Sequence, residues 1–347
     1  MIDFWTGLFL FGELFKKLKV DGTCFRDHDF NLFIVLGYIH PLDESHAVLK
    51  YTTEEERDSK RFLQAQGIHD YVNALKFLKS KKPHLIKYSD FYDVDLLTIP
   101  YSEVEIVYDG VEKLIKIVEN PSSRIEKLCA SFSEIVVENL GIKLEDMGVR
   151  GSILYGSPRP DSDIDITIFG KDKMRYFREH IDECSGVTVM PSLEVERVSE
   201  FLKNISPLSL EEIVPHVSKR KTKLDIEGLP ISIKCVRSEK EIEEDIPVFK
   251  TVSCKTLGPV IVKGKVTDAT ASLCYPVEYR IKDESPERNV DEVLCLESLF
   301  AEFVEEGDKI EVKGVLQEVE LDERKRYRRV VISTVELAGQ EYIKKIS

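Results

Sequence analysis

The chain has no pair of cysteines close enough in sequence to form a zinc ligand set or a redox motif. Its seven cysteines are scattered over 347 residues, and none forms a Cys-x-x-Cys pair. Scattered single cysteines are typical of reduced, mostly buried thiols rather than of a disulfide framework. The pattern therefore favours a cytoplasmic protein over a disulfide-dense secreted one.

The chain also has fewer positively than negatively charged residues. The 49 Lys and Arg residues face 63 Asp and Glu residues, which gives a formal net charge of −14. Attachment to nucleic acid over a broad surface requires Lys and Arg residues that neutralise phosphates, so it is not expected here. A local basic patch could still bind RNA, and the excess acid could serve solubility alone.

No apolar run is long enough to cross a membrane. The N-terminal apolar stretch contains Glu13, begins near Asp3 and has no preceding positive region, which argues against both a membrane span and a signal peptide. Its large residues recur at helical spacing, at Phe4, Leu8, Phe11, Phe15 and Leu18. We predict an amphipathic helix over residues 1–20 that docks on the protein's own body; the alternative is a membrane-surface or partner contact.

The strongest positive signal is a pair of aspartates one residue apart, Asp163 and Asp165. In a strand they point to one face, and the isoleucines beside them point to the other. Two adjacent carboxylates repel each other unless a cation or a proton joins them. Hard oxygen ligands of this kind suit Mg²⁺, which is commonly held by one or two carboxylates together with phosphate oxygens.

A Gly-Ser pair, Gly151 and Ser152, precedes the first aspartate with ten residues between. A Gly-Ser turn that opens a helix offers backbone N–H groups to an anion. A phosphate cradle and a metal-binding pair so close in sequence indicate phosphoryl or nucleotidyl transfer. A second pair, Gly156 and Ser157, lies too near Asp163 for this spacing. The alternative interpretation of the motif as a whole is a chance acidic turn on the surface.

This arrangement resembles the DNA polymerase beta-like nucleotidyltransferase superfamily. Its signature is an apolar residue, Gly, then Gly or Ser, about ten residues, and an Asp-apolar-Asp/Glu-apolar run, here Asp163 to Ile166. The chain as a whole resembles an archaeal group of predicted nucleotidyltransferases with a long N-terminal region and a C-terminal β domain. The further segments that suggest this are Arg26–Phe30, Gly37–Pro41, Leu49–Tyr51, Val104–Tyr108 and Ile226–Pro230.

The resemblance implies roles for these residues. The Gly151 N–H and the Ser152 hydroxyl would hold the terminal phosphates of a nucleoside triphosphate such as ATP, and Asp163 and Asp165 would bind Mg²⁺. A third carboxylate on a neighbouring strand normally completes the site and helps to deprotonate the acceptor.

The position of that third carboxylate is open. Ser232 stands where an acidic residue is expected, and Asp225 lies on the preceding strand within the pattern Leu224-Asp225-Ile226. If Asp225 faces the cleft it is catalytic; otherwise it is a surface residue. Basic residues should face the triphosphate, and the candidates are Arg159 or the group of Lys219, Arg220 and Lys221, each of which could equally be a solvated charge.

Hydrophobic patterning predicts several elements before and around the motif. Residues 30–40 predict a strand and residues 47–52 its hairpin partner. Helices are expected near 110–118, 121–140, 171–184 and 208–216, with Pro121 near a helix start and Gly141 as a C-cap. Residues 222–226 and 230–236 predict a hairpin that turns at Glu227-Gly228.

The C-terminal third predicts a small β-barrel. Five alternating segments, 260–268, 276–282, 290–296, 309–321 and 326–335, suggest an OB-like fold. The basic cluster around its last hairpin could bind single-stranded RNA or tRNA through Arg324, Arg326, Tyr327 and Arg328. The alternative is a solvated hairpin tip offset by Asp322 and Glu323.

Together these patterns predict an α+β protein in which a polymerase-beta-like nucleotidyltransferase domain is flanked by an N-terminal α+β domain and a C-terminal OB-like barrel. The expected boundaries are 1–20, 21–105, 106–245 and 246–347. The predicted activity is Mg²⁺-dependent transfer of a nucleoside monophosphate to RNA, protein or a small molecule. The alternatives are a catalytically weak or inactive nucleotide- or RNA-binding protein on the same scaffold and, less favoured by the extra domains, one half of a toxin–antitoxin pair.

Overall fold

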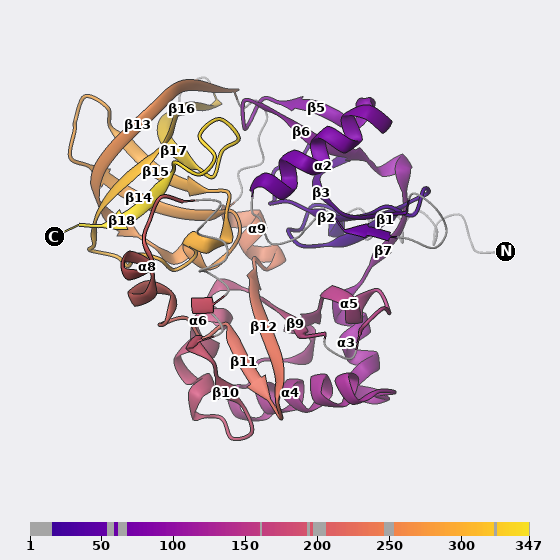
Figure 1. The fold of residues 1–347 in the computed structure, drawn as a ribbon. Helices are drawn as coiled ribbons and strands as arrows, with labels where there is room; N and C mark the ends of the chain where they lie inside the picture. Colours follow the sequence, from indigo (N-terminus) through magenta and orange to yellow (C-terminus); the bar gives the residue numbers. More distant parts are fainter. Residues whose placement is uncertain are drawn as a thin grey trace. The chain divides into compact units, whose positions relative to one another are not determined.

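A computed structural model describes residues 16–53, 59–61, 68–159, 162–192, 195–196, 206–245, 253–322 and 325–346. The chain divides into two compact units. One unit comprises residues 108–200 and 208–241, and the other comprises the remainder of the chain. Figure 1 shows both units, coloured along the sequence.

The N-terminal part of the larger unit is a mixed layer of strands and one long helix. Its strands are β1 (Cys24–Asp27), β2 (Leu32–Val35), β3 (Glu44–Thr53), β4 (Ser59–Arg61), β5 (Ile86–Ser89), β6 (Val94–Pro100) and β7 (Val104–Tyr108). They form a sheet in the order β5-β6-β3-β2-β1-β7, and β4 pairs with β3. The helix α2 (Ile68–Lys81) contributes Ala74 and Leu78 to a core that also contains Phe25, Phe33 and Leu49.

The strand predicted over residues 30–40 is shorter in the structure. It begins at Leu32 because Phe30 has a φ of 63°, and it ends at Val35, two residues before Gly37 with a φ of 70°. A left-handed backbone cannot continue an extended strand. Its antiparallel pairing with β3 confirms the predicted hairpin partner.

The smaller unit begins with two helices that the sequence predicted. The helix α3 (Gly110–Glu119) is capped by Asp109, whose side chain accepts hydrogen bonds from the backbone N–H groups of Val111 and Glu112. The helix α4 (Arg124–Leu140) begins after Ser123 and ends at Gly141, which has the left-handed φ of 64°. The structure confirms both predicted helices and the glycine C-cap.

The rest of this unit is a mixed sheet with helices between its strands. The elements in chain order are β8 (Met147–Val149), α5 (Gly151–Leu154), β9 (Ile164–Phe169), α6 (Lys171–His180), β10 (Thr188–Val189), α8 (Leu210–Val217), β11 (Lys223–Ile226), β12 (Leu229–Val236) and the first residues of α9 (Glu239–Asp245). The sheet order is β10-β11-β12-β9-β8, in which β12 and β9 are parallel and the other pairs antiparallel. The predicted hairpin turn at Glu227-Gly228 is confirmed, with left-handed φ angles at both residues.

The C-terminal strands form a closed ring. The elements are β13 (Ser253–Asp268), β14 (Val277–Asp283), β15 (Val290–Cys295), β16 (Lys309–Asp322) and β17 (Lys325–Ile332), and all five confirm predicted strands. They pair in the order β13-β14-β15-β17-β16, and β16 pairs back to β13 (Figure 1). A short strand that the sequence did not suggest, β18 (Tyr342–Lys345), extends the sheet beside β16.

Short 3₁₀ helices connect these elements at Pro83–Leu85, Tyr101–Glu103, Leu144–Asp146, Ile181–Glu183, Thr270–Leu273 and Ser298–Phe300. The predicted N-terminal helix falls mostly outside the described residues, although Leu18 is fully buried in the N-terminal core. No helix in the described ranges is long and apolar enough to cross a membrane. The molecule therefore has the mixed α and β composition predicted.

Candidate functional site

The aspartate pair lies at the start of β9, and the alternation of this strand sets its direction. The side chains of Ile164, Ile166 and Ile168 are fully buried on one face. Asp165 lies on the opposite face and is half-buried, and Asp163, immediately before the strand, is exposed. The isoleucines thus anchor the strand in the core while the two carboxylates stay accessible from the other face.

Gly151 lies directly against the second aspartate. A Cβ atom built on Gly151 would lie 2.1 Å from Oδ2 of Asp165, and the φ of Gly151 is +62°. The backbone N–H of Arg150 also donates to the carbonyl oxygen of Asp165 over 2.8 Å. The Gly-Ser turn and the aspartate pair are therefore adjacent in space as well as in sequence.

The loop between the turn and β9 is joined to Ser152. The Ser152 hydroxyl donates to the hydroxyl of Ser162 over 3.2 Å, and the backbone N–H of Arg159 donates to the same Ser162 oxygen over 2.8 Å. Arg159 itself is exposed. The structure therefore places Arg159 in a loop whose end leads directly into Asp163.

Ser232 occupies the strand position beside the second aspartate. In the parallel pairing of β12 with β9, Ser232 lies opposite Asp165, and in the antiparallel hairpin it lies opposite Lys223. The Ser232 hydroxyl donates to Oδ2 of Asp163 over 3.3 Å, and Nζ of Lys223 donates to the Ser232 hydroxyl. A lysine and a serine thus stand where a third carboxylate was expected.

Asp225 lies on β11, two residues closer to the hairpin turn than Lys223. It pairs with Pro230 rather than with Ser232, and its Oδ1 accepts a hydrogen bond from the backbone N–H of Gly228 over 2.9 Å. No group of three or more His, Cys, Asp or Glu side chains that could hold a metal ion occurs among the described residues. The structure therefore joins Asp225 to the hairpin turn and does not bring it into the aspartate pair's cluster.

The basic group before the hairpin is split between three environments. Lys219 is exposed, the Arg220 side chain is buried, and Lys221 forms an ion pair with Asp182. Their role toward a nucleotide stays a prediction.

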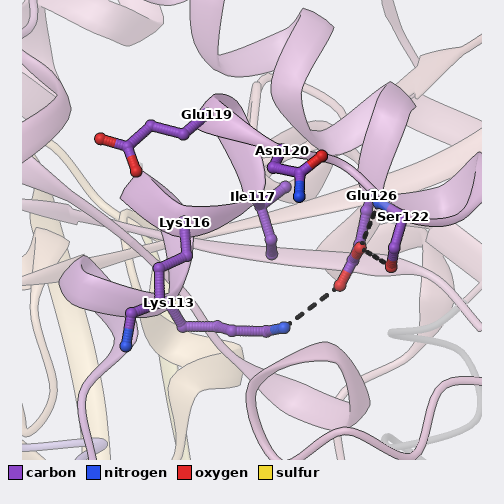
Figure 2. Close-up of a pocket in the computed structure, with 7 residues that line it drawn as sticks. All are labelled: Lys113, Lys116, Ile117, Glu119, Asn120, Ser122 and Glu126. Carbon is purple, nitrogen blue, oxygen red and sulfur yellow. Dashed lines mark hydrogen bonds and ion pairs between the residues drawn. The ribbon is translucent and has the colours of Figure 1, made fainter.

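A hollow in the surface of this unit lies away from the aspartate pair. The hollow has a volume of about 330 Å³ and lies along α3 and the start of α4. Figure 2 shows the residues that line it: Lys113, Lys116, Ile117, Glu119, Asn120, Ser122 and Glu126. Lys113 forms an ion pair with Glu126 over 3.1 Å, and Glu126 also accepts a hydrogen bond from the backbone N–H of Ser122. The hollow contains none of the predicted site residues, and its cations already face carboxylates, so it is a poor phosphate site.

The arginines of the C-terminal hairpin have acidic partners on the neighbouring strand. Arg326 pairs with Glu320 over 3.1 Å and Arg328 with Glu318 over 3.3 Å. Arg324 lies outside the described residues. These exposed pairs reduce the positive charge that the cluster presents, and the RNA contact stays a prediction.

Tyr327 lies between these arginines but is largely buried. Burial raises the pKa of its phenol, and the guanidinium of Arg280 lies 5.9 Å from the centre of its ring. A base stacked on this ring would have to displace or share the place of Arg280.

Comparison with known proteins gives one distant relation over nearly the full length. An uncharacterized protein of Methanocaldococcus jannaschii is 26% identical over 329 residues, which cover 90% of this chain and 94% of that protein. No protein-family model and no solved structure matches the chain. No activity is described for this relative, so the geometry of the site is the guide to function.

Lys223 is the site residue that sequence reasoning missed. The signal was present, because a two-residue turn at Glu227-Gly228 pairs Ile226 with Leu229 and therefore Lys223 with Ser232. Counting the register back from the turn would have placed a lysine beside the expected third position.

Proposed function

We propose that this protein is a Mg²⁺-dependent nucleotidyltransferase of the polymerase-beta-like kind. The observation that carries the proposal is the contact of Gly151 with Asp165, which leaves no room for any side chain at residue 151. A chance acidic turn would not require a glycine of the preceding turn to lie against its carboxylate. The motif spacing in the sequence and this contact in space support the same site.

The proposed reaction transfers a nucleoside monophosphate from a triphosphate to an acceptor hydroxyl. The acceptor oxygen forms a bond to the α-phosphorus while its hydroxyl proton passes to solvent. The bond from that phosphorus to the oxygen that bridges it to the β-phosphorus breaks, and pyrophosphate leaves. Asp163 and Asp165 are hard oxygen donors on one strand face and fit Mg²⁺, which would neutralise charge on the phosphates when bound.

The protein's own groups position the donor. The backbone N–H of Gly151 and the hydroxyl of Ser152 are hydrogen-bond donors next to the carboxylates, and Arg159 supplies a cation on the adjoining loop. Donors and cations fixed before the substrate arrives stabilise developing charge without reorganisation. The cytoplasm, where nucleoside triphosphates are abundant, is the proposed location.

A second function is favoured by Ser232. A serine cannot replace a metal-binding or proton-accepting carboxylate, so the scaffold could bind nucleotide or RNA with weak or no turnover. The closed ring β13-β14-β15-β17-β16, in which β15 and β17 are parallel, supports an OB-like domain that would accompany RNA binding in either case. Release of pyrophosphate that depends on Asp165 would exclude this second function.

The first prediction concerns ligand-dependent stability. A triphosphate that binds only the folded protein raises its free energy of unfolding, by about 2.7 kcal/mol when its concentration is 100 times its Kd. The melting temperature rises with it. We expect a rise that needs Mg²⁺ with one of ATP, GTP, CTP or UTP, and its loss in Asp163→Ala/Asp165→Ala, measured by thermal denaturation.

The matched control is Asp172→Ala, because Asp172 is an exposed aspartate on α6 of the same unit. This variant should keep the full Mg²⁺-dependent shift. An equal shift in the wild type and the double variant would show that the nucleotide binds somewhere other than at the aspartate pair.

A further inference from the structure

Three strands of the smaller unit bring one residue each into a single row across the sheet. Lys223 of β11 lies opposite Ser232 of β12, and Ser232 lies opposite Asp165 of β9. Neighbouring strands are about 4.8 Å apart, so the members of such a row are nearest neighbours across the sheet. Figure 1 shows β11 and β12 side by side as the hairpin that carries the first two residues.

The hydrogen bonds along this row have a defined direction. An ammonium group can only donate, so Nζ of Lys223 donates to the Ser232 hydroxyl, and that hydroxyl donates its own proton to Oδ2 of Asp163 over 3.3 Å. Ser232 therefore joins a fixed positive charge to the carboxylate pair. This relay orients the Asp163 carboxylate toward β12 before any ligand binds.

The relay changes the charge of the cluster. The pair Asp163 and Asp165 contributes two negative charges and Lys223 one positive charge, which gives a net charge of −1. A site with three carboxylates in the same place would carry −3. Asp225 does not restore the missing charge, because its Oδ1 is bonded to Gly228 in the hairpin turn.

Two divalent cations a few ångströms apart repel each other and need several anionic ligands to hold them. We infer that the site binds its nucleotide with a single divalent cation, and that Lys223, acting through Ser232, takes the electrostatic place of a second one. This inference rests on the proposed nucleotidyltransferase function and specifies the metal content of that site. Lys223 is a positioning residue here, because it contacts Ser232 rather than the reacting atoms.

The test counts bound metal without depending on activity. Full-length protein is titrated with Mn²⁺ in the presence of the α,β-methylene analogues of ATP, GTP, CTP and UTP, one at a time, and bound Mn²⁺ is measured by electron paramagnetic resonance. We expect one Mn²⁺ per chain in the wild type and two in Ser232→Asp. Two Mn²⁺ per chain in the wild type would overturn the inference and leave the proposed function standing.

The wild-type count decides the question even if a variant does not fold. No nucleotide-dependent Mn²⁺ binding with any of the four analogues would contradict the proposed function as well, so the two failures are distinguishable. Lys223→Met should weaken binding of the analogue roughly tenfold, the loss expected for one charge-assisted contact. Lys143→Met is its matched control, because Lys143 is an exposed lysine of the same unit that pairs with Glu145, and it should bind the analogue as the wild type does.

Discussion

At the scale of single residues, the candidate site depends on a glycine. Gly151 has a left-handed φ of +62°, which costs an ordinary residue about 1–2 kcal/mol. The space that its side chain would fill is already taken by the carboxylate of Asp165. Backbone conformation and packing therefore both require glycine at this position.

Gly151→Ala should accordingly lower the free energy of unfolding by more than the cost of its backbone conformation alone. The comparison is Gly156→Ala, because Gly156 also has a positive φ, of +75°, but has open space where a Cβ would be. We expect a loss of about 1 kcal/mol for Gly156→Ala and at least twice that for Gly151→Ala, measured by urea denaturation.

The same pair of variants also tests the contact with Asp165. Gly151→Ala should abolish the nucleotide-dependent melting shift, because the new methyl group displaces the carboxylate, whereas Gly156→Ala should retain it. Equal losses of stability in the two variants would show that Asp165 moves aside easily and that the close contact is not a constraint.

The residues that sequence reasoning found are those with local patterns. Gly151, Ser152, Asp163 and Asp165 follow from spacing along one stretch of chain. The role of Lys223 could not be found in this way, because it depends on the register in which β11, β12 and β9 pair. The parallel pairing of β12 with β9 cannot be read from either strand alone.

At the scale of elements, helix termini illustrate how local chemistry determines boundaries. The helix α4 begins where the Ser123 hydroxyl accepts a hydrogen bond from the backbone N–H of Glu126 over 3.3 Å. Glu126 in turn accepts from the backbone N–H and the hydroxyl of Ser122. These bonds satisfy donors that a helix start leaves without a partner.

Ser123→Ala removes that acceptor and should lower the free energy of unfolding by about 1 kcal/mol. Ser123→Asp should retain most of the stability, because a carboxylate can accept the same hydrogen bond and is favoured at a helix N-terminus. Urea denaturation of the two variants is the measurement. A loss of the same size in both would mean that the cap contributes through its shape and not through its hydrogen bond.

Strand prediction succeeded where alternation was long. The ring strands β13, β14 and β16 carry buried residues at alternate positions over much of their length, as in Val277, Tyr279 and Ile281 of β14, and the sequence showed that period. Short edge strands such as β10 and β18 have too few residues to show one. The strand at Phe30 was predicted too long because two left-handed residues lay hidden within an apolar run.

At the scale of the whole molecule, the larger unit holds its two sheets together through a buried arginine. Nη2 of Arg329 on β17 donates to the carbonyl oxygen of Phe91 over 2.8 Å, and its Nε donates to Gln317 over 2.9 Å. The guanidinium also lies 4.6 Å from the centre of the Phe91 ring. Arg329, which directly follows Arg328 in the sequence, therefore stabilises the fold.

Buried titratable groups make the stability of this unit depend on pH in two opposite ways. Burial lowers the pKa of His46 to about 4 and that of His40 to about 3, and Lys19 nearby acts in the same direction. Burial raises the pKa of Glu292 and Glu341 to about 7. As the pH falls below 7, protonation of the two histidines lowers the free energy of unfolding, and protonation of the two glutamates raises it. The net change in unfolding free energy is therefore smaller than the change from either pair alone.

The contribution of one histidine can be isolated with a variant that does not titrate. The folded-state pKa of His46 is lowered below the ordinary 6.5. The stability of the fold that depends on neutral His46 is therefore fully present above pH 6.5 and is lost as the pH falls toward about 4. Between pH 7 and pH 5 the wild type should lose about 2 kcal/mol of unfolding free energy that His46→Gln does not lose, measured by urea denaturation at each pH. A constant difference between the wild type and His46→Gln across this range would show that His46 accepts a proton in the folded protein as readily as in the unfolded chain.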